Sequence, residues 1–94
     1  MPVVRFDVLW PDSSVMKCLS PSTVIRNFIQ EGEVYSLLEF VTMAELGLNQ
    51  ASDRVREVYG YACSAAADQL EIIQTKADTF RGQPAASVQV LRVD

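Results

Sequence analysis

Histidine is absent from this 94-residue sequence, and glycine and cysteine are scarce. The missing imidazole removes the commonest general base, the commonest zinc ligand and every serine or cysteine triad that depends on histidine. The four glycines lie far apart, so neither the dinucleotide-binding nor the phosphate-binding glycine loop can form. Two cysteines and scattered carboxylates also fall short of the ligand set of a structural zinc. We therefore expect no metal site and no cofactor.

The two cysteines are Cys18 and Cys63. Small secreted domains that rely on disulfides carry more cysteines than this, so we expect both thiols to be reduced in the cytoplasm. No apolar run approaches the roughly 20 residues that span a bilayer. The first residues also lack the basic start and apolar stretch of a signal peptide. The sequence therefore predicts a soluble cytoplasmic protein without a membrane partner.

Acidic side chains outnumber basic ones by 12 to 8, which gives a formal charge of -4. A negative surface repels phosphate backbones, and this argues against nucleic acid as a partner. The length suits one domain, and with 49% hydrophobic and 21% charged residues the chain can bury a core. We expect a single folded domain across residues 1–94.

Two segments show the two-residue alternation of half-buried strands, and a third is short and apolar. Residues 4–10 alternate, and the turn-forming residues 11–14 lead into a short apolar segment at residues 15–19. Together these segments predict a hairpin. Residues 87–93 alternate in the same way. We expect this last strand to return beside the first.

The region between the strands predicts three helices. Ser20–Pro21 has the pattern of a cap followed by proline at the first helical position, which indicates a short helix ending near Gly32. Ser36 and Glu39 form the capping box of a second helix, with Gly47 as its expected end. The third helix follows the linker after Gly47.

In the third helix, apolar residues recur every three or four positions from Ser52 to Phe80, which predicts one long amphipathic helix. Gly60 lies within this pattern and costs about 1 kcal/mol relative to alanine. Either the helix bends there or another element packs close to its backbone. The segments together predict an α+β fold in the order ββαααβ. A three-stranded sheet, formed by the N-terminal hairpin and the C-terminal strand, packs on three helices, the last one long.

Polar and nucleophilic side chains gather within the predicted long helix. Tyr59, Tyr61, Cys63 and Ser64 lie close together, with Asp68 one turn further on, and these five are the candidate binding residues. A thiolate at Cys63 would be a nucleophile, with a tyrosine as a positioned donor. The alternative is structural. A cysteine in an alanine-rich helix usually packs as a small hydrophobe, and no cation lies within one turn on its own helix to lower its pKa.

Two further patterns carry possible chemistry. Asp68 and Glu71 are spaced to share a helix face, and glycoside hydrolases use such paired carboxylates, although charges of this kind usually form a solvated face. Residues 40–56 also have the pattern of a helix-turn-helix in which Arg54 and Arg56 would contact phosphates. The acidic neighbours and the net charge oppose DNA binding.

Short motifs spread along most of the chain carry a family resemblance. They are Arg5-Phe6, Trp10-Pro11-Asp12, Ser20-Pro21-Ser22, Tyr35, Glu39-Phe40, Ser52, Arg54-Val55, Tyr59-Gly60-Tyr61-Ala62-Cys63-Ser64 and Gln69-Leu70. In these motifs the sequence resembles a small bacterial family of nitrogen-starvation response proteins encoded in gene clusters that contain a nitrilase. The resemblance implies a role in using nitriles or cyanide as nitrogen sources. It implies no catalytic residue, and Tyr61 stands where the family is expected to have phenylalanine, which argues against a chemical role for that hydroxyl.

The residues and the resemblance together favour a non-catalytic accessory or binding protein. It would dock on a partner enzyme from the same gene cluster or hold a small intermediate. One alternative is a small enzyme that uses Cys63 or the carboxylates of Asp68 and Glu71. A second alternative is a DNA-binding regulator of the helix-turn-helix kind. We also expect a homodimer, because a long amphipathic helix and two edge strands leave surfaces to cover.

Overall fold

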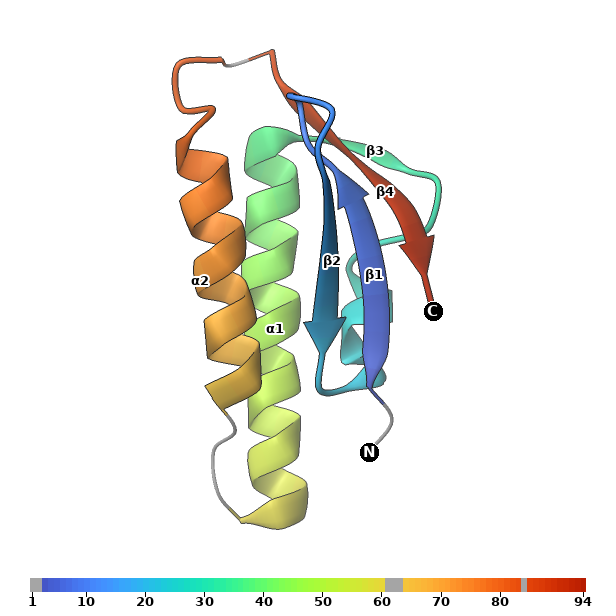
Figure 1. The fold of residues 1–94 in the computed structure, drawn as a ribbon. Helices are drawn as coiled ribbons and strands as arrows, with labels where there is room; N and C mark the ends of the chain where they lie inside the picture. Colours follow the sequence, from blue (N-terminus) through green and yellow to red (C-terminus); the bar gives the residue numbers. More distant parts are fainter. Residues whose placement is uncertain (1–2, 61–63, 84) are drawn as a thin grey trace.

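The computed structural model describes residues 3–60, 64–83 and 85–94. Its elements in chain order are β1 (Val4–Leu9), β2 (Val15–Ser20), the 3-10 helix η1 (Thr23–Asn27), β3 (Val34–Ser36), α1 (Leu37–Tyr59), α2 (Ser64–Asp78) and β4 (Ser87–Val93). The strands form one antiparallel sheet in the order β2-β1-β4-β3. The two α-helices lie side by side against one face of this sheet (Figure 1). Within the described residues, neither helix is long and apolar enough to span a membrane.

The hairpin of β1 and β2 has the predicted form. The even-numbered residues of β1 are buried in the core, whereas the odd-numbered ones lie on the opposite face. At the turn, the backbone N–H of Trp10 donates to the carbonyl of Ser14 at 2.9 Å. The carboxylate of Asp12 accepts from the backbone N–H of Ser14 at 3.0 Å, so the expected turn residues close the hairpin.

The sheet has a fourth strand, and the predicted three-stranded sheet is wrong. β3 contains three residues and pairs with β4 at the edge of the sheet. Two backbone bonds extend this pairing: the N–H of Gly32 donates to the carbonyl of Val90 at 2.7 Å, and the N–H of Val90 donates to the carbonyl of Glu33 at 2.9 Å. Three residues are too few to show an alternation in the sequence. This strand exists because β4 supplies its hydrogen-bond partners.

The first predicted helix is only the five-residue η1, and its N-cap is Ser22. The Oγ of Ser22 accepts from the N–H of Val24 at 3.4 Å. Ser20, the predicted cap, is instead buried and its hydroxyl donates to the carbonyl of Ser22 at 2.8 Å. Ile25 and Ile29 both reach the core from this tight turn. The apolar spacing is therefore satisfied without further helical turns.

The other two predicted helices are divided at the wrong glycine. α1 continues through Gly47 and ends at Gly60, which has a left-handed φ of 77° and donates its N–H to the carbonyl of Arg56 at 2.8 Å. α2 then forms a separate helix that ends at Asp78. The α+β class holds, but two α-helices replace the expected three, and no single long helix precedes the last strand.

Gly47 lies inside α1 because η1 packs directly against its backbone. A Cβ at position 47 would lie 2.4 Å from the Cδ1 of Ile25 and 3.2 Å from the ring of Phe28. A contact this short would force the side chain of Ile25 to shift within the buried core. The glycine therefore serves helix packing, not helix termination.

α1 begins where the capping box predicts. The Oγ of Ser36 accepts from the N–H of Glu39 at 3.2 Å. The same helix continues without a turn through residues 40–56, so the predicted helix-turn-helix is wrong. Arg54 and Arg56 are exposed on one continuous helix, with no second helix that would enter a DNA groove.

Trp10 closes the core where the hairpin meets the helices. Its ring meets Phe40 edge-on, with centroids 5.7 Å apart, and stacks on Phe80 at 6.0 Å. Just beyond it, the carboxylate of Asp12 lies 2.9 Å from the Nζ of Lys76. This ion pair ties the hairpin turn to α2, while the aromatic contacts seal the apolar interior beneath it.

Candidate functional site

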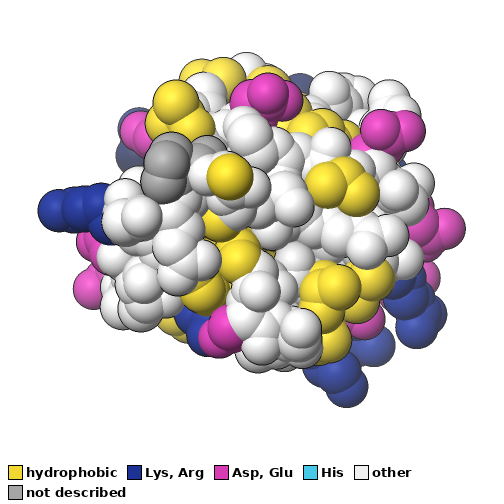
Figure 2. Space-filling model, turned by 90° about the horizontal axis from the view of Figure 1, so that it is seen from above, with side chains coloured by type: hydrophobic (Ala, Val, Ile, Leu, Met, Phe, Trp, Pro, Cys, Tyr) yellow, Lys and Arg dark blue, Asp and Glu magenta, His cyan; other side chains and the backbone are white. Residues whose placement is uncertain are grey.

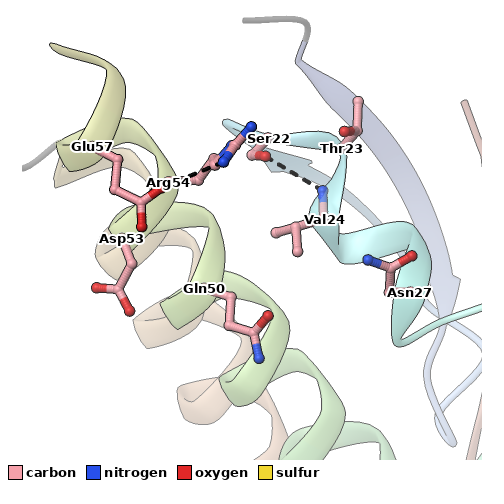
Figure 3. A pocket seen from close by; sticks show the side chains of 8 residues that line it. All are labelled: Ser22, Thr23, Val24, Asn27, Gln50, Asp53, Arg54 and Glu57. Atoms are coloured by element: carbon pink, nitrogen blue, oxygen red, sulfur yellow. Dashed lines mark hydrogen bonds and ion pairs between the residues drawn. The ribbon is translucent and has the colours of Figure 1, made fainter.

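A groove of about 530 Å³ lies between η1 and the C-terminal half of α1 (Figure 3). We call it the polar groove. Its lining residues are Ser22, Thr23, Val24, Asn27, Gln50, Asp53, Arg54 and Glu57. All but one of these side chains are polar or charged, so the groove suits a polar ligand better than an apolar one.

The two walls of the polar groove are held together by the close contact beside it. Gly47 lies one helical turn before Gln50 and lets Ile25 of η1 sit against the backbone of α1. Ala51 and Val55, which alternate with the lining residues along α1, are buried in the protein. The spacing of the walls is thus set by packing before any ligand arrives.

The α1 wall is one stripe of polar side chains. Gln50, Asp53, Arg54 and Glu57 recur at spacings of three and four, which places them on one face of the helix. The guanidinium of Arg54 lies 3.4 Å from the carboxylate of Glu57, in a well-exposed pair that adds little stability. No hydrogen bond or ion pair joins the Asp53 carboxylate to any other residue that the structure describes. Its charge is therefore available to a ligand.

The η1 wall adds neutral hydrogen-bonding groups. Figure 3 shows Gln50 extending from α1 toward η1, with Asn27 on the facing wall. Thr23 stands on the same wall as Asn27. Within the described part of the chain, the side chains of these three residues make no hydrogen bond to protein. Carboxamides both donate and accept, so they can bind the polar group of a ligand whose positive end meets Asp53.

The groove offers binding groups without an evident nucleophile. It carries two carboxylates and one guanidinium, hence an excess of negative charge. Among the described residues, no thiol lines it and no group of three or more side chains could hold a metal ion. The arrangement can bind a small organic cation.

The sequence-predicted binding residues lie at the far end of the helix pair. Tyr59 ends α1 and is 49% exposed, Ser64 begins α2, and Asp68 follows one turn later. All three are exposed where the helices connect, opposite the β1–β2 turn (Figure 1). Tyr61 and Cys63 lie outside the described residues. A site formed by all five residues therefore stays a prediction.

The carboxylates of Asp68 and Glu71 are both exposed on α2. Glu71 borders a shallow groove of about 400 Å³ together with Met16 and Lys76. Asp68 does not line that groove. The two carboxylates therefore do not share this groove as a substrate site.

Cys18 is buried on β2, with an exposed fraction of 1%. Burial, together with the negative charge of Asp7, raises the pKa of the thiol to about 12. A thiol that stays protonated at neutral pH is a poor nucleophile. Cys18 therefore packs as a small hydrophobe in the core.

An apolar groove of about 580 Å³ lies between the start of α1 and the end of α2. Leu37, Leu38 and Val41 line one side, and Ala77 and Phe80 line the other. Figure 2 views the molecule from this end and shows hydrophobic side chains in several separate groups among polar surface.

The polar groove was missed in the sequence because its walls come from two distant segments. The α1 half was visible as a polar stripe, but Arg54 was interpreted as a phosphate contact of a helix-turn-helix. The η1 half, residues 22–27, gave no signal of its own. Only the contact between Gly47 and Ile25 brings the two halves together.

The fold and the groove define a small two-layer α+β protein with a polar cleft between its 3-10 helix and its longest helix. A family model described as nitrogen starvation-induced protein NitG matches residues 5–93, and the chain belongs to this family. The resemblance to a nitrogen-starvation family is thereby confirmed. No curated protein and no solved structure matches the chain.

Proposed function

We propose that the protein is a non-catalytic binding protein of the nitrogen-starvation response and that it holds a small nitrogen-containing cation in the polar groove. The observation that carries this proposal is the carboxylate of Asp53, which has no partner among the described residues and lines the same groove as the carboxamides of Gln50 and Asn27. The proposal places the protein in the cytoplasm as one domain spanning residues 1–94.

The donors and acceptors of the groove indicate the ligand class. An ammonium or guanidinium group can bind Asp53 through charge-assisted hydrogen bonds, which are roughly twice as strong as neutral ones. The carboxamides of Gln50 and Asn27 can then bind a polar group elsewhere on the same molecule. A volume of about 530 Å³ suits a metabolite-sized ligand. These features support a small amine with a second polar group.

The residues that line the polar groove support binding of a ligand over its chemical conversion. The carboxylate of Glu57 is paired with Arg54, so Asp53 is the one carboxylate of the groove without a partner among the described residues. Thr23 has a hydroxyl but no base within hydrogen-bond distance in the described structure. In the nitrilase gene cluster that the sequence resemblance implies, the ligand would be an amine-bearing intermediate that the protein protects or delivers to an enzyme.

The test is an NMR titration of the ¹⁵N-labelled protein with agmatine, which carries an ammonium and a guanidinium. We expect chemical-shift changes confined to residues 22–27 and 50–57. Asp53→Asn should weaken binding at least tenfold, because it removes the charge that meets the ligand. Asp68→Asn removes an exposed carboxylate outside the groove and should leave the affinity unchanged.

Glutarate serves as the matched negative probe because it has a similar length and the opposite charge. It should cause no shifts in the groove. Equal agmatine affinity in Asp53→Asn and the unmodified protein would refute the assigned site. Failure of agmatine and other small amines to shift any groove resonance at millimolar concentration would refute the proposed function.

A further inference from the structure

One face of the sheet is not covered by any described helix or strand (Figure 1). The helices lie on the other side (Figure 1), where the even-numbered residues of β1 enter the core. Arg5, Asp7 and Leu9 therefore face outward, together with their cross-strand neighbours on β2 and β4. We call this surface the open sheet face.

A row of side chains crosses the open sheet face from one edge to the other. The strand register joins Val15 to Leu9, Leu9 to Gln89, and Gln89 to Val34. Val15 is 55% exposed and Val34 is 56% exposed. Leu19, at the other end of β2, is also half exposed. The solvent face of an antiparallel sheet is normally polar, so the three aliphatic side chains of this row, which Gln89 interrupts, indicate a surface that another molecule covers.

The charges on the open sheet face are mainly positive. Arg5, Lys17 and Arg92 lie on it, with Asp7 as the cross-strand neighbour of both Lys17 and Arg92. At the end of β4, Arg92 is also 3.9 Å from the carboxylate of Asp94. The whole chain carries a formal charge of -4, so the helical side is correspondingly acidic. Three basic side chains therefore lie on the same sheet face as the exposed Val15, Leu19 and Val34.

We infer that the open sheet face docks a partner protein whose contact surface is aliphatic and bordered by carboxylates. The row of Val15, Leu9 and Val34 would be covered by the apolar part of the partner. Lys17, Arg5 and Arg92 would meet its carboxylates, and their field would orient the approach of a negatively charged surface. The docking is independent of the polar groove, which lies on the helical side.

The size of the face sets the strength of the contact. Strand spacing and rise give an area of about 20 by 20 Å, on the order of 400 Å². Stable complexes bury about 800 Å² on each partner. The complex is therefore transient and sensitive to salt, as befits a protein that delivers or exchanges a ligand.

Other occupants fit this face less well. Sheet proteins that bind single-stranded nucleic acid stack bases on exposed aromatic rings, whereas Phe6 and Trp10 are buried toward the helices. A second copy would bring two net-positive faces together. Pairing through the β2 edge is opposed as well, because Gln69 accepts the outward N–H of Leu19 at 3.0 Å and Lys17 would face its own copy.

The experiment uses the photo-crosslinking residue p-benzoylphenylalanine, placed at Leu19 or, as a control, at Leu38 in the source cells during nitrogen starvation. Leu38 is a 77% exposed leucine on the helical side. We expect one protein to be crosslinked from position 19 and not from position 38. Thermal melting of both variants checks that the fold is retained, and Asp53→Asn should leave the crosslink intact.

The captured protein is then purified and titrated against charge-reversal variants. Lys17→Glu with Arg92→Glu should raise the Kd at least tenfold, and higher salt should weaken the unmodified complex. Arg56→Glu with Arg81→Glu changes the total charge equally on the helical side and should leave the Kd within about twofold. Crosslinks of equal strength from position 38, a crosslink to a second copy or to nucleic acid, or a Kd unaffected by the Lys17 and Arg92 reversals would each overturn the inference.

Discussion

Gly47 and Gly60 lie on the same helix and have opposite roles. At Gly47 the backbone is helical, and a Cβ would collide with Ile25. At Gly60 no atom of the described residues lies within 4 Å of an added Cβ, but the φ of 77° requires a left-handed conformation. Glycine is required at position 47 because a distant segment of the chain packs against it, and at position 60 because of its own backbone conformation. Substitutions can separate these two causes.

The largest effect is expected from Gly47→Val. The Cβ would lie 2.4 Å from Ile25 before the two methyl groups are added, in a region where Ile25 is fully buried. We expect a loss of about 3 kcal/mol in the free energy of unfolding, measured by urea denaturation. The agmatine response should also disappear, because η1 would be displaced from α1. Retained stability and binding would show that η1 does not pack on position 47.

A smaller loss is expected from Gly60→Ala. A left-handed conformation costs a residue with a side chain about 1–2 kcal/mol, and no side-chain clash adds to it here. Gly60→Asn should lose less, because asparagine tolerates this conformation better. Urea denaturation measures both variants. Agmatine binding should be unchanged, in contrast to Gly47→Val, so a loss of binding in Gly60→Ala would argue against separate roles.

The ion pair of Asp12 with Lys76 is a polar contact between distant segments, in contrast to the apolar contact between Gly47 and Ile25. Hydrogen bonds from Ser14, and then from Lys76, hold the pKa of this carboxyl well below its usual range. A carboxyl whose pKa is depressed in the folded protein adds stability at pH values above its unfolded pKa of about 3.9. That stability is lost as the pH falls toward the pKa of the folded protein. The unmodified protein should exceed Asp12→Asn in melting temperature at neutral pH by a small margin, and the margin should shrink below about pH 4. A margin that is constant from pH 2 to 7 would exclude a contribution from the charge.

Gly82→Ala should have the smallest effect. An added Cβ would meet nothing within 4 Å, and the backbone is not left-handed there. We expect a change within about 0.5 kcal/mol in the free energy of unfolding. A loss as large as that of Gly60→Ala would mean that open space and ordinary φ are insufficient to explain when a glycine is required.

The strands β1, β2 and β4 and the start of α1 were predictable because their signals are local. Alternation over six or seven residues reveals the buried face of β1 and β4, the turn residues 11–14 place β2 beside β1, and the Oγ of Ser36 accepts from the N–H of Glu39 within a single turn. These features do not depend on how the rest of the chain folds. Local sequence patterns therefore identified them with nearly correct bounds.

The features that sequence analysis missed depend on distant partners. β3 is a strand because β4 lies beside it, and Gly47 resembles a helix stop until Ile25 is placed against it. The exchange of roles between Gly47 and Gly60 produced the wrong helix count. No local pattern distinguishes a glycine required by packing from one required by its φ.

The candidate site was predictable only in part. The stripe from Gln50 to Glu57 was present in the sequence, but its facing wall on η1 was not. The predicted group around Tyr59, Ser64 and Asp68 lies at another end of the molecule and stays a separate prediction. A cleft between segments that are distant in sequence becomes visible only when the fold is known.

Trp10 is the only tryptophan of the chain. Its ring contacts Phe40, in the first turn of α1, and Phe80, just after the end of α2. Its indole is 2% exposed, and within the described residues the Nε1 atom has no hydrogen-bond partner. Loss of either helix from the hairpin would give this nitrogen access to water. The fluorescence of a single residue can therefore report, without any label, whether both helices are seated on the sheet.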